Sequence, residues 1–268
     1  MLFDKCPIGF INADDKTVIT IKEKNKTCTF KTFGIDNPAD IRAEEETLKI
    51  TPSCIDFVAD LDGKREQFEV SIPGRFSVYN SLGAISVAHE FGVTPDEMRK
   101  ALKDLKVLGR NELVPNKLGL TILIDYAHTP SSLESILESV KAYAKGKIIC
   151  AWGVGGDRDS KKRPIMGEIS GRLADYTILM SDQVRTEDPL KILQDIEVGV
   201  KKSGGKYTII VDRTEGIKHA LEVATPEDII VIPGLGHDLY LERNHVKYPY
   251  DERKVIAKLV DEIIEERK

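Results

Sequence analysis

Two arginines lie in segments where a protein could hold a small anionic ligand. Arg158 lies at the tip of the glycine-rich stretch Gly153–Asp159, and Arg185 follows the next expected strand beside Asp182. A guanidinium can hold a carboxylate through two parallel hydrogen bonds, and an aspartate can accept from an ammonium group. The pattern favours a zwitterionic ligand such as an amino acid. The purely structural alternatives are a glycine-rich turn and a surface ion pair between Arg185 and Asp182.

Three further polar residues stand at the ends of expected strands. Asp125 ends one strand and would either cap the next helix or contact a ribose, a lysine or a metal. His128 and His237 lie in loops where a histidine is either locally hydrogen-bonded or catalytic. Common motifs do not decide the matter, because the sequence contains no G-x-x-x-x-G-K-[ST], H-E-x-x-H or G-x-S-x-G pattern and no cysteine pair at metal-ligand spacing.

The segments that must position these residues alternate between strand and helix after residue 108. The expected strands are 120–125, 147–152, 176–180, 207–211 and 229–233, and the expected helices are 131–144, 162–174, 189–202, 214–224 and 251–266. Continuous apolar strands such as Ile229–Ile232 are typical of a parallel sheet covered on both faces. We therefore predict a doubly wound α/β domain that binds ligands beyond the carboxyl ends of its strands.

Residues before 108 are expected to form a different, β-rich fold. Short strands are predicted at 8–12, 17–21, 27–30, 47–50, 55–60 and 67–72, with helices at 78–90 and 95–105. Thr94 is placed to cap the second helix, and Pro95 suits its first turn. This pattern predicts an antiparallel or mixed sheet with helices on one side, and a domain division into 1–108 and 109–268.

The composition excludes several classes of protein. The 268 residues carry 39 basic and 44 acidic side chains, and a net charge of -5 gives no electrostatic reason to expect nucleic-acid binding. No apolar run approaches the roughly 18–20 residues that span a bilayer, and Met1–Gly9 lacks a signal-peptide pattern. The four cysteines are widely spaced, which favours reduced thiols and a cytoplasmic protein. Because no apolar run is long enough to span a bilayer, no membrane partner is expected.

Taken together, the loops resemble those of the Mur ligases, which join an amino acid to a growing peptidoglycan peptide. The similar segments are, in chain order, 11–15 (INADD), 74–76 (GRF) with Asn80, Gly109-Arg110 with Glu112, 125–130 (DYAHTP), 155–159 (GGDRD), 181–189 (SDQVRTEDP) and 234–238 (GLGHD). They are most similar to the members that add the third amino acid of the stem peptide. The resemblance implies the later part of the central ATP-binding domain over 1–108 and the Rossmann-like amino-acid-binding domain over 109–268.

The resemblance also implies a reaction and a site. ATP, with Mg²⁺, would phosphorylate the terminal carboxylate of a UDP-MurNAc-dipeptide, and the amine of a diamino acid would attack the acyl phosphate to form an amide. The residues implied to face the nucleotide are Asn80, Arg110, Asp125 and His128. Those implied to form the amino-acid pocket are Arg158, Asp182, Gln183, Arg185, Gly234, His237 and Asp238.

Several positions depart from the family pattern. Ser77 replaces an asparagine, Gln183-Val184 replaces Asn-Pro, Leu235 replaces a lysine, and Asp238 is one methylene shorter than the expected glutamate. Arg185 matches the arginine that members using meso-diaminopimelate present to its extra carboxylate. The resemblance therefore favours diaminopimelate over lysine.

The family's UDP-sugar domain, P-loop and carbamylated lysine all precede the stretch that matches Met1. We therefore expect these 268 residues to bind an amino acid, but neither to hydrolyse ATP nor to form a peptide bond unless the missing N-terminal half is supplied as a partner. The catalytic residues stay unassigned. Two alternatives are a binding module for amino acids or nucleotides without catalysis, and a related ligase for another polymer, such as the folylpolyglutamate or cyanophycin synthetases.

Overall fold

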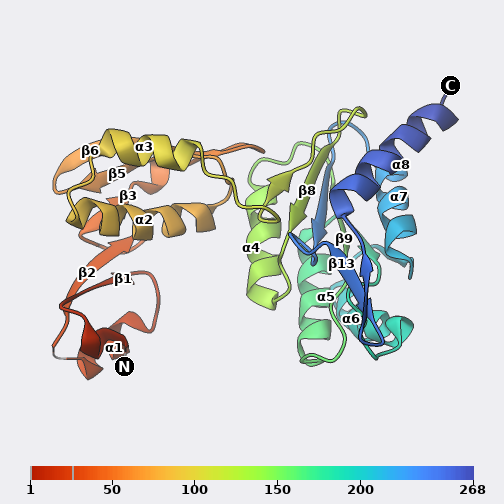
Figure 1. Ribbon diagram of the computed structural model, residues 1–268, viewed down its shortest axis with the longest axis horizontal. Helices are drawn as coiled ribbons and strands as arrows, with labels where there is room; N and C mark the ends of the chain where they lie inside the picture. The colour runs from red at the N-terminus through yellow and green to blue at the C-terminus, as the bar shows by residue number, and fades with distance from the viewer. Residues whose placement is uncertain (1, 26) are drawn as a thin grey trace. The chain divides into compact units, whose positions relative to one another are not determined.

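The computed structural model describes residues 2–25 and 27–268, which form two compact units (Figure 1). Unit 1 is Met1–Lys106 and unit 2 is Val107–Lys268. Each unit has its own hydrophobic core, with one cluster of buried side chains in unit 1 and two in unit 2. In the described part of the chain, no helix is long and apolar enough to cross a membrane.

Unit 1 is built on a mixed sheet with the strand order β1-β2-β3-β5-β4, and β6 pairs with the other edge of β5. Its first three strands are parallel, and β5 runs antiparallel to its three neighbours. The strands are β1 (Ile8–Asn12), β2 (Thr29–Gly34), β3 (Ile41–Ala43), β4 (Lys49–Ile50), β5 (Ile55–Leu61) and β6 (Lys64–Val70). A mixed sheet agrees with the sequence-based prediction.

Two helices cover the core of unit 1. Helix α2 (Arg75–Glu90) packs Leu82 and Ile85 against the sheet, and α3 (Pro95–Lys103) adds Met98 and Leu102. Thr94 caps α3 in a reciprocal capping box with Glu97, and Pro95 occupies the first turn, so the predicted start of this helix is confirmed.

The predicted strand at 17–21 is wrong, because this segment begins a short helix, α1 (Val18–Lys24). Its β-branched residues favour a strand, but the Asp15 carboxylate accepts from both the backbone N–H and the hydroxyl of Thr17, at 2.8 and 2.7 Å, and closes a turn there. Three other predicted strands are displaced, the one predicted at 67–72 lying at Lys64–Val70. β2 runs from Thr29 to Gly34, and the 47–50 segment is extended only at Lys49–Ile50, after a 3₁₀ turn at Glu45–Thr47.

Unit 2 has a six-stranded sheet in the order β11-β10-β9-β12-β8-β7. All neighbours are parallel except β7, which runs antiparallel to β8. The strands are β7 (Glu112–Leu113), β8 (Thr121–Asp125), β9 (Ile148–Trp152), β10 (Tyr176–Leu179), β11 (Tyr207–Ile209) and β12 (Ile229–Pro233). The chain leaves β9 towards β11 and then returns to place β12 between β9 and β8, which creates a topological switch point.

Helices pack on both faces of this sheet, as a doubly wound domain requires. On one face, sheet residues such as Leu123 and Trp152 pack against three helices, which are α4 (Pro130–Lys141), α5 (Lys162–Leu173) and α6 (Pro189–Ser203). On the other face, residues such as Ile124 and Ile230 pack against two helices, which are α7 (Arg213–Val223) and α8 (Glu252–Glu266). The predicted fold class is confirmed.

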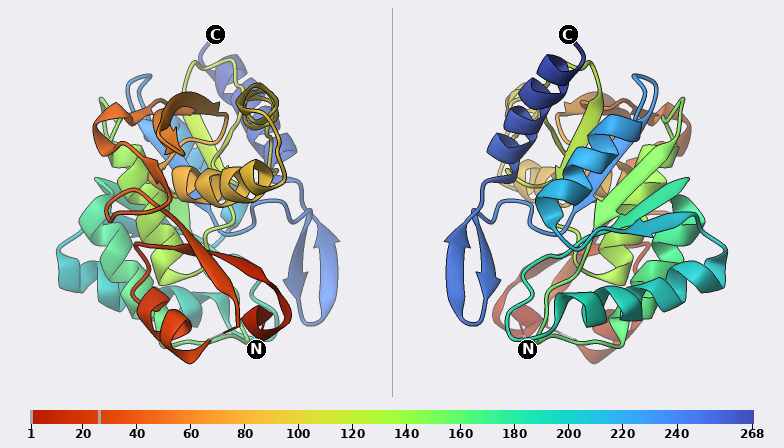
Figure 2. Two further views of the ribbon diagram at one scale, coloured as in Figure 1. Left: turned by 90° about the vertical axis from the view of Figure 1, so that its left-hand side faces the viewer. Right: turned by 90° about the vertical axis from the view of Figure 1, so that its right-hand side faces the viewer.

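A hairpin of β13 (Tyr240–Arg243) and β14 (Val246–Pro249) was not predicted and stands at the side of unit 2 (Figure 2). Asn244 and His245 at its turn both have positive φ, at 48° and 63°, which suits a two-residue hairpin loop. The hairpin is tied to the loop after β10, because Arg185 donates its backbone N–H to the Glu242 carbonyl and accepts from the Asn244 N–H.

Candidate functional site

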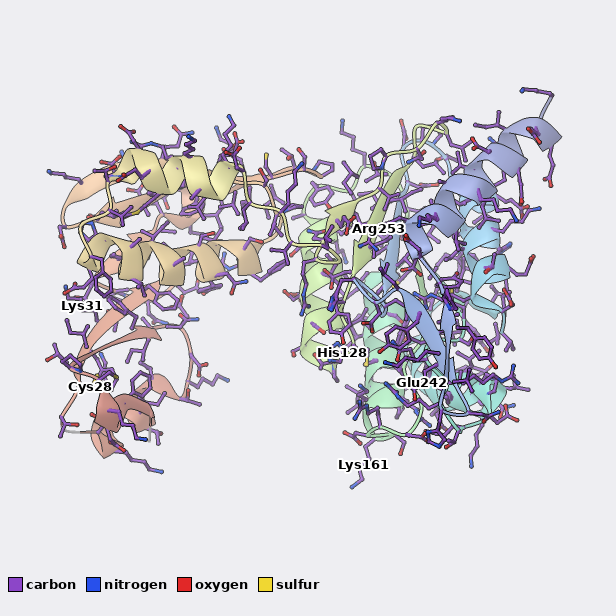
Figure 3. The ribbon with its side chains drawn as sticks, viewed as in Figure 1. Cys28, Lys31, His128, Lys161, Glu242 and Arg253 are labelled. Carbon is purple, nitrogen blue, oxygen red and sulfur yellow. The ribbon has the colours of Figure 1, made fainter. Side chains whose placement is uncertain are left out.

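The loops that follow four strands of unit 2 meet along one edge of the sheet. The strand register aligns Asp125 with Pro233 and Trp152 with Leu179, so the segments after β8, β9, β10 and β12 leave the sheet side by side. We call this edge the rim. It contains nine of the eleven residues that the sequence nominated, and Figure 3 shows the position of one of them, His128. Arg110, from the segment before β7, joins the rim through its contact with the Tyr126 ring.

Tyr126 organises the part of the rim next to Asp125. The Arg110 guanidinium lies over its ring at 5.1 Å, and the rings of His128 and His237 lie 4.7 and 4.8 Å from it. Two nominated nucleotide contacts and one nominated amino-acid contact therefore share one aromatic side chain, which sequence reasoning missed.

Asp125 is buried at the base of this cluster. Its carboxylate accepts from the backbone N–H of Asn111 at 2.7 Å. Burial raises the pKa of Asp125, although the backbone N–H of Asn111 and the Arg110 charge oppose the rise. The carboxylate is therefore an acceptor held in place. The alternative that Asp125 caps the next helix is wrong, because Thr129 caps α4.

Glycine allows the backbones of the rim to touch. A Cβ on Gly153 would lie 2.0 Å from the Met180 carbonyl oxygen, and one on Gly156 would lie 2.1 Å from that of Val184. The loops after β9 and β10 are thus packed backbone against backbone. The glycine-rich stretch has a structural function here, and it also brings Arg158 and Arg185 to the same edge.

Arg185 is held from three sides. Its Nη1 donates to the Gly156 carbonyl at 2.7 Å, its Nη2 lies 3.4 Å from Gln183 Oε1, and its Nε lies 3.5 Å from Glu242 Oε2. Gln183 in turn donates through Nε2 to Asp238 Oδ2 at 2.7 Å. The structure therefore joins three nominated residues, Arg185, Gln183 and Asp238, in one hydrogen-bonded chain.

Asp182 sits beneath this chain and is 9% exposed. Its Oδ1 accepts from the Gln183 N–H at 2.6 Å, and a Cβ on Gly234 would lie only 2.3 Å from its Oδ2. Burial raises the pKa of Asp182, while the nearby Arg213 guanidinium and the Gln183 N–H oppose the rise. Gly234, at φ +127°, is the residue that leaves room for this carboxylate.

Arg158 differs from Arg185 because its side chain is exposed and makes no hydrogen bond or ion pair with the described residues. The loop that carries it is nevertheless fixed. Asp157, at φ +53°, accepts from the hydroxyl of Thr186 at 2.8 Å and donates its N–H to Glu187. Arg158 thus extends a long, exposed side chain from a fixed backbone, and its guanidinium is suited to contact a ligand that enters from solvent.

Two buried charged residues of the site were missed by sequence reasoning. Arg213 begins α7 and Glu252 begins α8, and their side chains are 1% and 0% exposed. A cavity of about 730 Å³ reaches Asp182 and Arg213 and is walled by residues that include Glu242, Arg243, Tyr248 and Tyr250. The only available signal was a charged residue in the first turn of each helix, which also occurs in ordinary helices.

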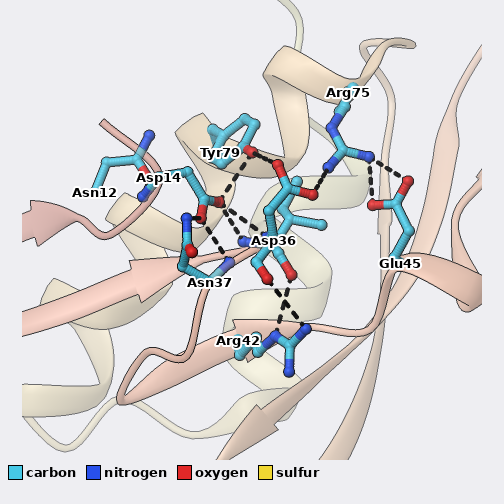
Figure 4. Close-up of polar contacts among 9 residues, drawn as sticks. Asn12, Asp14, Asp36, Asn37, Arg42, Glu45, Arg75 and Tyr79 are labelled. Carbon is cyan, nitrogen blue, oxygen red and sulfur yellow. Dashed lines mark hydrogen bonds and ion pairs between the residues drawn. The ribbon is translucent and has the colours of Figure 1, made fainter. Parts of the chain in front are cut away.

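In unit 1, the segments INADD and GRF meet in one polar network (Figure 4). The Asp14 carboxylate accepts from the backbone N–H groups of the loop after β2 and from the Tyr79 hydroxyl at 2.9 Å. Arg75 forms ion pairs with Asp36 and Glu45. Asn80, the remaining nominated residue, lies exposed on α2 one residue beyond Tyr79. The position of Ser77 is buried, so this departure from the family pattern faces the interior.

No group of three or more histidine, cysteine, aspartate or glutamate side chains suited to a metal ion occurs within residues 2–25 and 27–268. Arg110 and the anchored Asp125 present a cation and an acceptor at the same edge, which are the groups that a nucleotide would need there.

The chain is thus a two-part α/β protein, in which a mixed-sheet unit is followed by a doubly wound domain with two arginines and buried carboxylates at its rim. The family of Mur ligases accounts for both units. The Mur ligase middle domain matches residues 1–88, and the Mur ligase glutamate ligase domain matches residues 109–236. The chain belongs to the Mur ligase family.

Two relatives within the family carry the same name and are similar to nearly the whole of this chain. A UDP-N-acetylmuramoyl-L-alanyl-D-glutamate--2,6-diaminopimelate ligase of Caldanaerobacter subterraneus is 40% identical over 252 residues, which is 94% of this chain and 52% of that protein. A ligase of the same name, numbered 2, from Clostridium acetobutylicum is 40% identical over 260 residues, which is 97% of this chain and 53% of that protein. The chain thus spans about half the length of the curated relatives it matches.

Solved structures of Mur ligases are also similar to this chain. A UDP-N-acetylmuramoyl-L-alanyl-D-glutamate--2,6-diaminopimelate ligase is 29% identical, with a TM-score of 0.64 over 96% of this chain and 53% of that one. MurF from Acinetobacter baumannii gives a TM-score of 0.70 at 14% identity, over 95% of this chain and 51% of that one. The second similarity concerns the fold alone.

Proposed function

We propose that this chain supplies the amino-acid-binding site and part of the nucleotide site of an ATP-dependent ligase that adds meso-diaminopimelate to UDP-MurNAc-L-Ala-D-Glu. The observation that carries the proposal is the hydrogen-bonded chain from Arg185 through Gln183 to Asp238, which lies above the buried Asp182. Relatives of this chain carry the name of that ligase, and their similarity covers both units.

The proposed pocket divides by charge. Diaminopimelate carries two ammonium and two carboxylate groups, whereas lysine has only one carboxylate. Arg158 and Arg185 would each hold a carboxylate, and Asp182 and Asp238 would accept from ammonium groups. Gly234 and His237 would line the pocket from the loop after β12. Because Arg185 is already oriented by Gly156, little side-chain entropy is lost when it binds.

The nucleotide contacts are proposed for Asn80 in unit 1 and for Arg110, Asp125 and His128 in unit 2. Asp125 is suited to accept from a ribose hydroxyl, and Arg110 to neutralise phosphate charge. We propose a cytoplasmic enzyme, since its four cysteines are free thiols, with the remaining half of the ligase as its partner. Neither nucleic acid nor membrane is part of the proposal.

Isothermal calorimetry tests the pocket directly. The 268-residue chain is expected to bind meso-diaminopimelate at least about tenfold more tightly than L-lysine, because lysine leaves one guanidinium without a carboxylate. Arg185→Ala should remove this preference. Arg172→Ala, which changes an exposed arginine paired with Glu134, is the matched control and should preserve it. An unchanged preference in Arg185→Ala would refute the assignment of the pocket.

A second assay concerns the reaction. With ATP, Mg²⁺, UDP-MurNAc-dipeptide and diaminopimelate, the 268-residue chain alone should release no ADP, because its sequence contains no phosphate-binding G-x-x-x-x-G-K-[ST] loop. Addition of the N-terminal half of a relative is expected to restore turnover. ADP formation by the chain alone would contradict the proposal.

The alternative of a binding module without catalysis has one observation in its favour. Leu235 occupies the position where the family pattern has a lysine, and it is 1% exposed, so it offers no cation at the rim. Under this alternative, diaminopimelate binds but the added N-terminal half restores no turnover. The same two assays therefore separate the functions.

A further inference from the structure

Three buried charged side chains meet behind the rim. Arg213 Nε donates to Glu252 Oε1 at 2.7 Å, and Arg213 Nη1 donates to the Ser181 carbonyl at 3.2 Å and lies 3.7 Å from Asp182 Oδ2. The exposed fractions of the Arg213, Glu252 and Asp182 side chains are 1%, 0% and 9%. We call this group the Asp182 cluster.

The Asp182 cluster contains two carboxylates and one guanidinium. Glu252 Oε2 and Arg213 Nη2 are both buried without a hydrogen-bond partner among the described residues. A buried carboxylate that shares its counter-ion is costly, because the interior solvates charge poorly. The cluster is therefore one positive charge short of neutrality.

The neighbouring charges do not cancel this deficit. The Arg185 charge acts on Asp182 but is paired with Glu242, and the Lys162 ammonium, on α5, acts on both Asp182 and Asp159. Arg253, which acts on Glu252, is paired with Glu112. Asp238, from the loop after β12, adds a further negative charge next to Asp182. The phenol of Tyr250 faces Arg213 and Glu252, and burial raises its pKa, so it stays neutral.

We propose that Arg213 and Glu252 are positioning residues of the amino-acid site, which hold Asp182 in place and leave its cluster short of one positive charge that an ammonium group of the ligand provides. The inference rests on the proposed function and deepens it. Arg213 fixes one side of Asp182, Gly234 closes the other, and Glu252 occupies the guanidinium so that it cannot fully neutralise Asp182.

The cavity of about 730 Å³ opens onto the Asp182 cluster from the side of the β13–β14 hairpin, because Asp182, Arg213 and Glu242 are among the residues that line it. Burial raises the pKa of both Asp182 and Glu252, with the Arg213 charge opposing the rise. Without ligand, a proton would supply the missing charge. An arriving ammonium would replace this proton, so that binding of the diamino acid is coupled to proton release.

The first test uses the ligand-free chain and follows the carboxyl carbon of Asp182 by NMR as pH changes. In Glu252→Gln, which keeps the size of the side chain and removes its charge, Arg213 faces Asp182 alone. The pKa of Asp182 is then expected to fall by about one pH unit. Glu252→Asp keeps the charge and should keep the higher value.

Asp195→Asn is the matched control, because it also removes a carboxylate from a buried arginine, Arg163, at 2.9 Å. It should leave the titration of Asp182 unchanged. If Glu252→Gln also leaves it unchanged, the inference is overturned. This outcome does not depend on whether the chain binds diaminopimelate.

The second test is calorimetry with meso-diaminopimelate in two buffers of different ionisation enthalpy, which counts the protons released. The wild-type chain should release protons near the pKa of Asp182, and Glu252→Gln should release fewer and bind about tenfold more weakly. Equal proton release and affinity in the two would contradict the inference. If the wild type binds no diaminopimelate, the proposed function fails, whereas the NMR test still decides the coupling within the cluster.

Discussion

Asp14 in unit 1 and Asp182 in unit 2 are aspartates that follow strands, and their surroundings affect them in opposite ways. Asp14 accepts five hydrogen bonds, from the backbone of Ile35, Asp36 and Asn37, the Asn37 amide and the Tyr79 hydroxyl. Burial alone would raise its pKa, but these donors outweigh it and lower the pKa to about 2.

Asp182 accepts one backbone hydrogen bond and shares one guanidinium with Glu252. Burial therefore prevails and raises its pKa. A carboxylate saturated with donors holds a fold together, whereas one left short of donors is prepared for a ligand. Substitutions at either aspartate, or at the residues around it, separate the two cases.

Gly234→Ala should have the largest effect. At φ +127°, with its new Cβ 2.3 Å from Asp182 Oδ2, alanine would displace the carboxylate. We expect a loss of about 3 kcal/mol in the free energy of unfolding of unit 2 and more than about tenfold weaker binding of diaminopimelate. Chemical denaturation and calorimetry measure the two effects.

Gly204→Ala is the control for this prediction. Gly204 also has a positive φ, +72°, but nothing lies within 4 Å of its added Cβ. This variant should cost about 1 kcal/mol and leave binding unchanged. If the two variants lose the same unfolding free energy and the same affinity for diaminopimelate, backbone strain, and not displacement of Asp182, explains the effect of Gly234→Ala.

Asp14→Ala should destabilise unit 1 by about 2 kcal/mol, because several backbone N–H groups lose a charged acceptor at once. Hydrogen exchange followed by mass spectrometry, which separates the two units, should detect faster exchange confined to unit 1. Asp56→Asn changes a strand aspartate with no such donors and should stay within about 0.5 kcal/mol of the wild type. Faster exchange in both variants would refute the distinction.

The two units should also respond oppositely to acid. The pKa of Asp14 is lowered, so its contribution to stability is present above about pH 4 and is lost as the pH falls towards about 2. The pKa of Asp182 is raised, so protonation favours folded unit 2 as the pH falls through that value. Asp14→Asn should flatten the acid loss of unit 1, which urea unfolding at several pH values can measure.

The smallest effect on stability is expected for Arg158→Ala. Its exposed side chain makes no hydrogen bond with the described residues, so the free energy of unfolding should change by less than about 0.5 kcal/mol. The affinity for diaminopimelate should nevertheless fall several-fold. Unchanged affinity would remove Arg158 from the proposed pocket, while a large loss of stability would show a structural function.

The rim of unit 2 could be predicted from the sequence, because buried parallel strands are recognisable as apolar runs and the loops that follow them must share one edge. Sequence reasoning failed at 17–21, where one side chain, Asp15, outweighed the strand preference of its neighbours. It also missed the Asp182 cluster. Arg213 and Glu252 are distant in the chain and meet only through tertiary packing, so no spacing could indicate that they share a charge with Asp182.

The most direct measurement follows the carboxyl carbons of Asp14 and Asp182 by NMR across pH, with and without saturating meso-diaminopimelate. Asp14 is expected to titrate near pH 2 in both conditions. Asp182 should titrate above its ordinary range in the free chain and at a lower pH once the ligand supplies an ammonium group. An Asp182 that titrates at its ordinary value and ignores the ligand would contradict the account.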